Sequence, residues 1–208
     1  MTVNLGKYAK AIADFDQVIK NNPDIGTIVI EGARYDFPSH DFLRAIQKTA
    51  KKQGITIVSD EITSGWRITD GGVYKLNDFQ PDIVVYGKGM GNGYAISAIV
   101  GKKDVMDMAQ ETFISSTFWT ERIGPAAGLK TLEVMERENS WEQITATGKT
   151  IGKRWQVLAN KYELPIKIQG LPALVNFSIL EKNWLKYKTL ITQEMLKKGY
   201  LAANSVYV

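Results

Sequence analysis

The chain has 208 residues, 44% hydrophobic and 23% charged, which is enough for one sizeable globular domain, or one domain and part of another. It has no cysteine and one histidine, which excludes disulfides and thiolate metal sites and leaves His40 as the single candidate for histidine-dependent chemistry. The net charge of +4 comes from 26 basic and 22 acidic residues dispersed along the chain, so we expect no nucleic-acid partner. No apolar run could span a bilayer and no secretory signal is visible, so we expect a cytoplasmic protein with no membrane partner.

The first two thirds of the chain alternate between short β-rich runs and helical patterns. Strands are expected at 25–31, 55–59, 82–86 and 94–100, and helices at 41–53 and 102–110. Ser39 and Gly54 stand where the N-cap and C-cap of the first of these helices are expected. Apolar strands separated by helices are typical of a parallel sheet covered on both faces, so the expected fold class is α/β.

The pattern changes near Asn139. A long amphipathic helix is expected at 140–162, then strands at 165–169 and 173–180 and a last helix at 183–198. We therefore divide the chain into residues 1–139, part of a large domain, and residues 140–208, the beginning of a smaller α+β domain. No flexible linker separates the two parts, so we expect them to pack together directly.

Two loops that follow predicted strands carry residues suited to chemistry. Asp60 ends one strand, and ligands of open α/β sheets bind beyond the carboxyl ends of strands, although a turn acid is also common there. Residues 87–93 (GKGMGNG) follow another strand; their glycines would let a ligand approach and leave Lys88 uncrowded, while a solvated loop lysine is the alternative. Neither dinucleotide-binding nor Walker spacing fits this loop, which disfavours a nucleotide-binding α/β protein.

Two further motifs have ordinary structural explanations beside functional ones. Gly148-Lys149-Thr150 matches the end of a P-loop, but Gln143 occupies the place of the first glycine and the run lies inside a predicted helix. Ser116 and Thr117 precede a helix expected from Gly124, where hydroxyls either cap the helix or bind a phosphate together with backbone N–H groups.

Three segments together resemble the class III, or omega-type, pyridoxal-phosphate-dependent aminotransferases, nearest to the branch that contains glutamate-1-semialdehyde 2,1-aminomutase. They are IVSDEITSGWR (57–67), YGKGMGNGYAISAIVG (86–101) and STFWTERIGPAAGLKTLEVM (116–135). Their order and spacing match the family over nearly the whole chain. The resemblance implies a fold type I transferase, of which the chain carries part of the large, mainly parallel-sheet domain and the start of the α+β small domain.

The resemblance also implies a cofactor, pyridoxal 5'-phosphate, and roles for four residues. Lys88 would be the catalytic residue, forming an aldimine with the cofactor aldehyde and shuttling a proton. Asp60 would pair with the pyridine nitrogen, Ile62 would pack against one ring face, and Thr117 would hydrogen-bond the phosphate, usually across a dimer interface. The implied activity transfers an amino group from an amino donor to a carbonyl acceptor, or within one molecule as in the aminomutase, in a homodimer.

Two features depart from the family pattern. The family's usual Ser-Gly-Asn-Pro after the phosphate threonine is replaced by residues 119–122 (WTER), which indicates an unusual substrate or entry loop. Residues 1–25 carry neither the family's glycine-rich phosphate loop nor its stacking aromatic residue. We therefore expect a partial family member that binds the cofactor weakly alone and self-associates or needs a partner chain. The alternative function is a non-catalytic truncated remnant with a structural or assembly role.

Overall fold

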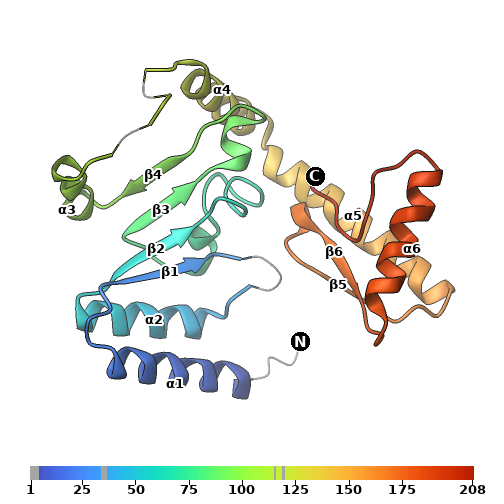
Figure 1. The fold of residues 1–208 in the computed structure, drawn as a ribbon, viewed down its shortest axis with the longest axis horizontal. Coiled ribbons are helices and arrows are strands. Elements are labelled where there is room, and N and C mark those ends of the chain that lie inside the picture. Colours follow the sequence, from blue (N-terminus) through green and yellow to red (C-terminus); the bar gives the residue numbers. More distant parts are fainter. Residues whose placement is uncertain (1–4, 34–36, 115, 119) are drawn as a thin grey trace.

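The computed structural model of the chain describes residues 5–33, 37–114, 116–118 and 120–208, and these form two sheets with associated helices (Figure 1). The helices are α1 (Leu5–Asn21), α2 (His40–Gln53), α3 (Lys103–Met106), α4 (Ile123–Glu138), α5 (Ser140–Lys161) and α6 (Trp184–Lys197). The strands are β1 (Thr27–Glu31), β2 (Thr56–Asp60), β3 (Ile83–Tyr86), β4 (Ala98–Gly101), β5 (Ile166–Gln169) and β6 (Asn176–Ile179).

The first sheet has the strand order β1-β2-β3-β4 and is mainly parallel, as expected. β1, β2 and β3 run parallel, with Glu31 opposite Asp60 and Asp60 opposite Val85, whereas β4 runs antiparallel to β3. The carboxyl ends of the three parallel strands therefore lie together at one edge, and their arrows in Figure 1 point toward the part of the chain that begins with α5. This edge carries the two loops singled out above.

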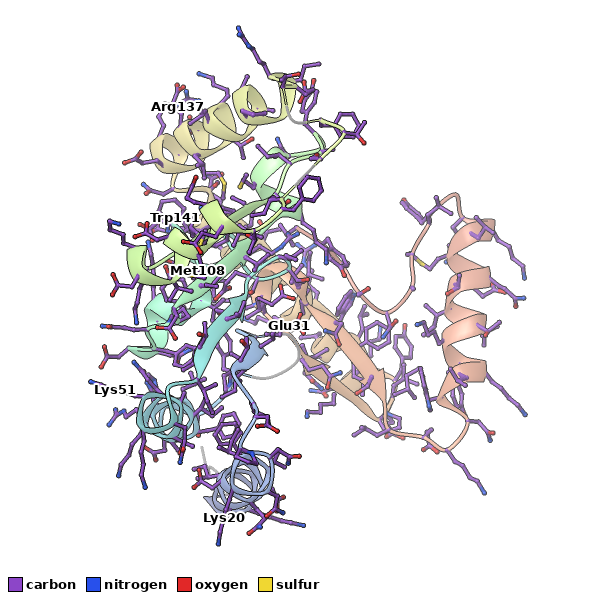
Figure 2. All side chains as sticks on the ribbon, turned by 60° about the vertical axis from the view of Figure 1, so that its left-hand side comes forward. Lys20, Glu31, Lys51, Met108, Arg137 and Trp141 are labelled. Carbon is purple, nitrogen blue, oxygen red and sulfur yellow. The ribbon has the colours of Figure 1, made fainter. Side chains whose placement is uncertain are left out.

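Helix α2 begins and ends at the cap residues that the sequence indicates. The Ser39 hydroxyl accepts a hydrogen bond from the Phe42 amide at 3.2 Å, and Gly54 closes the helix with a left-handed φ of 68°. The apolar face of the helix packs with β2 and α1 in the main core, which contains Ile19, Leu43, Ile46, Ala50 and Ile57. Figure 2 shows the charged side chains of α1 and α2, such as Lys20 and Lys51, on the outside of this layer.

Three predicted elements differ from the observed ones, each for a local reason. The strand expected from residue 94 begins at Ala98, because the Tyr94 amide closes a turn onto the Gly91 carbonyl at 3.0 Å. The helix expected at 102–110 changes after Met106 into a 3-10 turn, and neither piece has a buried residue that would hold a longer helix in place. The strand expected at 173–180 is preceded by the short 3-10 helix η4 (Pro172–Leu174) and starts at Asn176.

The C-terminal unit, defined as α5 to the end of the chain, is built on the antiparallel pair β5–β6. α5 packs against η4 and β5, and the Trp155 ring meets the Phe177 ring edge-on with centroids 5.0 Å apart. The last residues return along β6, where the Phe177 amide donates to the Asn204 carbonyl at 3.0 Å and the Val206 amide to the Val175 carbonyl at 2.9 Å. The end of the chain is thereby brought back toward the first sheet (Figure 1).

One face of the first sheet retains apolar residues that the described part of the chain does not cover. Val29 on β1 is 68% exposed, and Ile99 on β4 is 60% exposed. Parallel sheets are usually covered on both faces, so these residues mark a surface where further polypeptide can pack. Among the described helices, none is long and apolar enough to cross a membrane.

Candidate cofactor site at the carboxyl edge of the sheet

Lys88 lies two residues after the end of β3, at the start of the short 3-10 helix η2 (Lys88–Gly91). Its backbone is left-handed, with φ of 38°, a conformation that is uncommon for a residue with a side chain and that recurs at functional sites. Gly87 before it is buried, whereas the lysine side chain is exposed. Its ammonium nitrogen donates a hydrogen bond to the Thr63 hydroxyl at 2.7 Å, so the loop after β2 and the loop after β3 meet at this amine.

Asp60 is the last residue of β2, and Ile62 lies in the loop that follows it. The Asp60 carboxylate accepts a hydrogen bond from the Ile62 amide at 3.0 Å, an Asx turn that fixes the chain as it leaves β2. The Ile62 side chain lies against the backbone of the lysine loop, since a Cβ built on Gly87 would be 3.4 Å from Ile62 Cγ2. The structure therefore brings Asp60, Ile62 and Lys88 together at the carboxyl ends of two adjacent strands.

Glu61, which sequence reasoning did not single out, is fully buried beneath these loops. Its carboxylate accepts hydrogen bonds from the Ser59 and Ser64 hydroxyls and, at 3.2 Å, from the Tyr74 amide. A Cβ on Gly72 would lie 2.9 Å from the same carboxylate, so the loop comes close enough that only glycine fits without displacement. The signal in the sequence is the pair of serines two residues before and three residues after the acid.

A cavity of about 410 Å³ separates the Lys88 loop from the C-terminal unit. Thr63 and Lys88 contribute from the first sheet; the C-terminal unit contributes Gln169, Leu174, Asn176, Ser178, Trp184, Lys188, Asn204, Ser205 and Tyr207. Of the described residues that line it, none is acidic, and most are amides, hydroxyls or lysines. The volume is within the range of small-molecule sites, and the lining suits a polar ligand that bears negative charge. Asp60 and Ile62 lie beside this cavity rather than in its wall.

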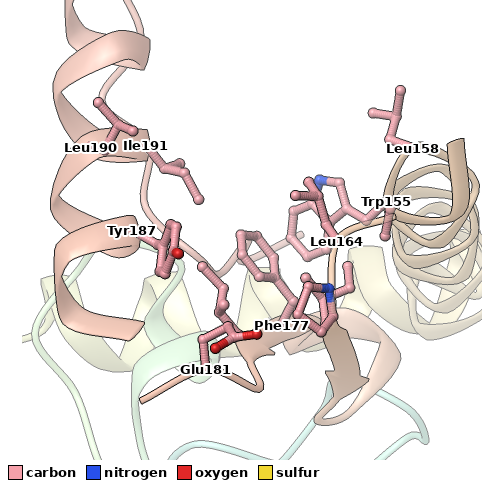
Figure 3. Close-up of a pocket in the computed structure, with 12 residues that line it drawn as sticks. Trp155, Leu158, Leu164, Phe177, Glu181, Tyr187, Leu190 and Ile191 are labelled. Carbon is pink, nitrogen blue, oxygen red and sulfur yellow. The ribbon is translucent and has the colours of Figure 1, made fainter. Parts of the chain in front are cut away.

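A second cavity, of about 400 Å³, lies between α5, the β5–β6 pair and α6 (Figure 3). Its walls are almost wholly apolar, with Trp155, Phe177 and Leu190 among them and Glu181 at the margin. No lysine is among the described residues that line it, so the polar cavity beside Lys88 is the candidate site.

Thr117 does not join the other three predicted residues. It lies in an exposed turn before α4, and the polar cavity does not include it. The first amides of α4 are capped by the Glu121 carboxylate, which accepts hydrogen bonds from Ile123 and, at 3.0 Å, from Gly124. That helix N-terminus is therefore satisfied by an acid rather than open to a phosphate. Trp119, in the same segment, lies outside the described residues.

Arg67 connects the site to the end of the chain. Its Nε donates to the Thr63 carbonyl at 2.7 Å, and its guanidinium lies 5.7 Å from the centre of the Tyr207 ring. Burial lowers the pKa of Arg67, with the nearby Tyr207 acting in the opposite direction. Deeper in the same layer, Trp66 packs on Tyr86 with ring centroids 4.2 Å apart, and burial raises the pKa of Tyr86. Within the described residues, no group of histidines, cysteines or acids could hold a metal ion.

Lys88 follows β3 of a mainly parallel sheet, and Asp60 ends the neighbouring strand β2. This arrangement of a lysine and an acid suits a pyridoxal-phosphate-dependent transferase. Solved structures share the fold. The FumI protein of Sphingopyxis sp. MTA144, in its PLP internal aldimine form, matches with a TM-score of 0.89 at 20% identity, over 94% of this chain and 50% of that one. An S-selective transaminase from Arthrobacter sp. matches with a TM-score of 0.76 at 23% identity, over 93% and 49%. The expected fold type I architecture is confirmed.

The family model for aminotransferase class-III matches residues 5–205, and the chain therefore belongs to the class III aminotransferase family. The 3-aminobutyryl-CoA aminotransferase of Cloacimonas acidaminovorans (strain Evry) is 32% identical over 180 residues, which covers 83% of this chain and 44% of that protein. The glutamate-1-semialdehyde 2,1-aminomutase of Polynucleobacter necessarius subsp. necessarius (strain STIR1) is 26% identical over 214 residues, or 94% and 49%. The chain spans about half the length of these relatives.

Proposed function

We propose that the chain carries the lysine-bearing part of a pyridoxal-phosphate-dependent class III aminotransferase, or of the related aminomutase. Lys88 is the catalytic residue, Asp60 and Ile62 bind the cofactor within the same chain, and Thr117 binds the cofactor phosphate of a second copy. The observation that carries the proposal is the exposed Lys88 amine, which meets the Thr63 hydroxyl at 2.7 Å in a polar cavity of about 410 Å³ at the carboxyl edge of the sheet. Membership of the class III family supports the same assignment.

The residues beside the cavity fit this cofactor. The amine that would bind its aldehyde is exposed, and no acidic residue among the described lining competes for it. Asp60 presents a carboxylate one strand away, where it would hold a proton on the pyridine nitrogen, and Ile62 offers an apolar side chain to the ring. When bound, the cofactor supplies an electron sink for negative charge at the substrate carbon. Lys88 Nζ would then carry the proton that leaves and rejoins that carbon.

The substrates are an amino donor and a carbonyl acceptor, and the protein acts as a homodimer in the cytoplasm. An exposed apolar surface beside Thr117 supports contact with a second copy: Phe113 is 96% exposed and Phe118 is 69% exposed. Such a contact would carry Thr117 to the cofactor phosphate of the other copy. We place the boundary between the large domain and the small domain at Asn139, so that residues 1–139 and 140–208 form the two parts.

Cofactor trapping tests the proposal without relying on turnover. The 208-residue chain is mixed with pyridoxal phosphate and reduced with borohydride, and the labelled peptide is identified by mass spectrometry. We expect the label on Lys88 and a yellow protein before reduction. The matched control is Lys102→Gln, which removes an exposed lysine that is paired with Asp82 at 2.7 Å and should leave the label unchanged. Label spread over many lysines, or none on Lys88, would contradict the assignment.

A non-catalytic remnant with an assembly role is the second candidate function. The capping of α4 by Glu121 favours it, because the helix N-terminus nearest Thr117 is then closed to the cofactor phosphate within this chain. The two candidates differ in the trapping experiment. A remnant gives no selective label at Lys88 even at high cofactor concentration, whereas an enzyme part gives a saturable label at that residue.

A further inference from the structure

The Lys88 amine is held by a chain of contacts that begins in the C-terminal unit. The Tyr207 ring lies against the Arg67 guanidinium, and Arg67 Nε donates to the Thr63 carbonyl at 2.7 Å. The Thr63 hydroxyl in turn accepts the hydrogen bond from Lys88 Nζ at 2.7 Å. Of the described residues, Thr63 is the one hydrogen-bond partner of this amine. Arg67 and Thr63 lie in the same loop after β2, and the two outer contacts tie that loop to the end of the chain at Tyr207 and to the Lys88 loop.

We infer that Thr63 is the positioning residue of Lys88: its hydroxyl holds the amine toward the polar cavity, and Arg67 fixes Thr63 in turn. The inference rests on the proposed function of Lys88 as the residue that binds the cofactor aldehyde. A lysine side chain has four rotatable bonds, and an exposed lysine samples many rotamers unless a partner selects one. A held amine reacts faster with a bound aldehyde because the approach geometry is set before the reaction.

The position of the hydroxyl is itself determined by the backbone. Thr63 lies between the Asx turn of Asp60 and the buried Ser64 hydroxyl, so the loop cannot turn it away without breaking those bonds. Lys88 starts from a left-handed backbone, which directs its side chain out of η2 toward the loop after β2. Both ends of the Thr63–Lys88 hydrogen bond are therefore set by local structure.

The first test measures how fast pyridoxal phosphate is fixed on Lys88 in the 208-residue chain, by quenching with borohydride at successive times and quantifying the Lys88 peptide. Thr63→Val keeps the shape of the side chain and removes the hydroxyl. We expect the rate of labelling at Lys88 to fall roughly three- to tenfold, the effect of losing one hydrogen bond of ordinary strength. Thr63→Ser keeps the hydroxyl and should label at the wild-type rate. Thr189→Val, which removes an exposed hydroxyl on α6, is the matched control.

The second test asks whether Arg67 acts through Thr63. Arg67→Gln alone should slow labelling of Lys88, and in the Thr63→Val background it should slow it no further, because the contact it supports is already lost. Effects that multiply in the double variant would overturn the link between the two residues. Urea unfolding of each variant shows that the comparison is made on folded protein, and Thr63→Ala replaces the valine variant if that one is destabilised.

The outcomes separate this inference from the function it rests on. If the wild type is not labelled at Lys88, the proposed function fails, and the positioning role falls with it. If the wild type is labelled but Thr63→Val reacts equally fast, the function stands and the positioning role is overturned. If Thr63→Val is labelled slowly while Thr63→Ser is labelled at the wild-type rate, the proposed function and the positioning role are both supported.

Discussion

Replacing Gly148 with alanine tests how α5 docks on the C-terminal unit. A Cβ built on Gly148 would lie 1.7 Å from the Pro172 carbonyl oxygen and 2.4 Å from its carbonyl carbon, both of them backbone atoms. Ordinary carbon contacts need 3.5 Å or more, so α5 and η4 would have to separate by roughly 1.5–2 Å. The turn cannot yield alone, because the neighbouring Ala173 is fully buried.

Two terms of opposite sign decide the magnitude. Alanine in place of glycine inside a helix contributes about 1 kcal/mol of stability. Forcing an extra methyl into a packed interface costs about 1–3 kcal/mol, and more where backbone must move, as it must here. With the packing cost at or above about 3 kcal/mol for this backbone contact, and the helix gain subtracted, we expect Gly148→Ala to lower the free energy of unfolding by about 2 kcal/mol or more, measured by urea denaturation with circular dichroism.

Gly152→Ala, one turn further along α5, is the matched control. Its Cβ would lie 3.3 Å from Ile168 Cγ2 and from Val175 Cγ2, which are side-chain methyls that can shift slightly. The helix-propensity gain and the small packing cost then nearly cancel, and we expect a change within about 1 kcal/mol of zero. If Gly148→Ala proved as stable as the wild type, the close approach of α5 to η4 would be refuted.

Three further predictions follow from the site. Glu61→Gln should lower the free energy of unfolding by about 2–4 kcal/mol, because an amide group replaces part of a buried acceptor of three hydrogen bonds; a loss below about 0.5 kcal/mol in urea denaturation would contradict this. Burial raises the pKa of Tyr86 above its ordinary 10.0, so the folded state keeps a proton that the unfolded state releases, and stability should fall as pH rises above that value. Tyr86→Phe should weaken that fall, which urea midpoints on either side of pH 10 can show. In a form of the protein completed to the length of its relatives, Asp60→Asn should still allow cofactor trapping on Lys88 but slow half-transamination about ten- to hundredfold, and an unchanged rate would make Asp60 a turn residue only.

The placement of Asp60, Ile62 and Lys88 could be predicted from sequence because it depends on short-range signals. Buried parallel strands appear as apolar runs, and the residues that follow them lie at the carboxyl edge of the sheet. The cap residues of α2 are equally local, since Ser39 and Gly54 act within one helical turn. These features need no knowledge of which distant segments pair.

The direction of β4 and the contacts of the Lys88 amine depend on distant segments. β4 pairs antiparallel with β3, and the connection over residues 87–97 is short for the crossover that a parallel pairing requires. The length of this connection alone therefore indicates that β4 is antiparallel to β3. Nothing comparable indicates the hydrogen bond between Thr63 and Lys88, because it depends on the left-handed backbone at Lys88 and on the path of a separate loop.

Gly148 shows why a short motif is ambiguous without its packing partner. Glycine inside a helix costs about 1 kcal/mol relative to alanine, so its presence calls for a compensating reason, and a phosphate-binding loop is one such reason. The structure supplies a different reason: the Pro172 carbonyl occupies the space that a side chain on residue 148 would need. That contact sets the distance between α5 and η4, and the last residue of η4, Leu174, lines the polar cavity together with Asn176 at the start of β6. Gly148, which matches a P-loop glycine in sequence, therefore contributes to the site indirectly, because it fixes the position of this wall of the polar cavity.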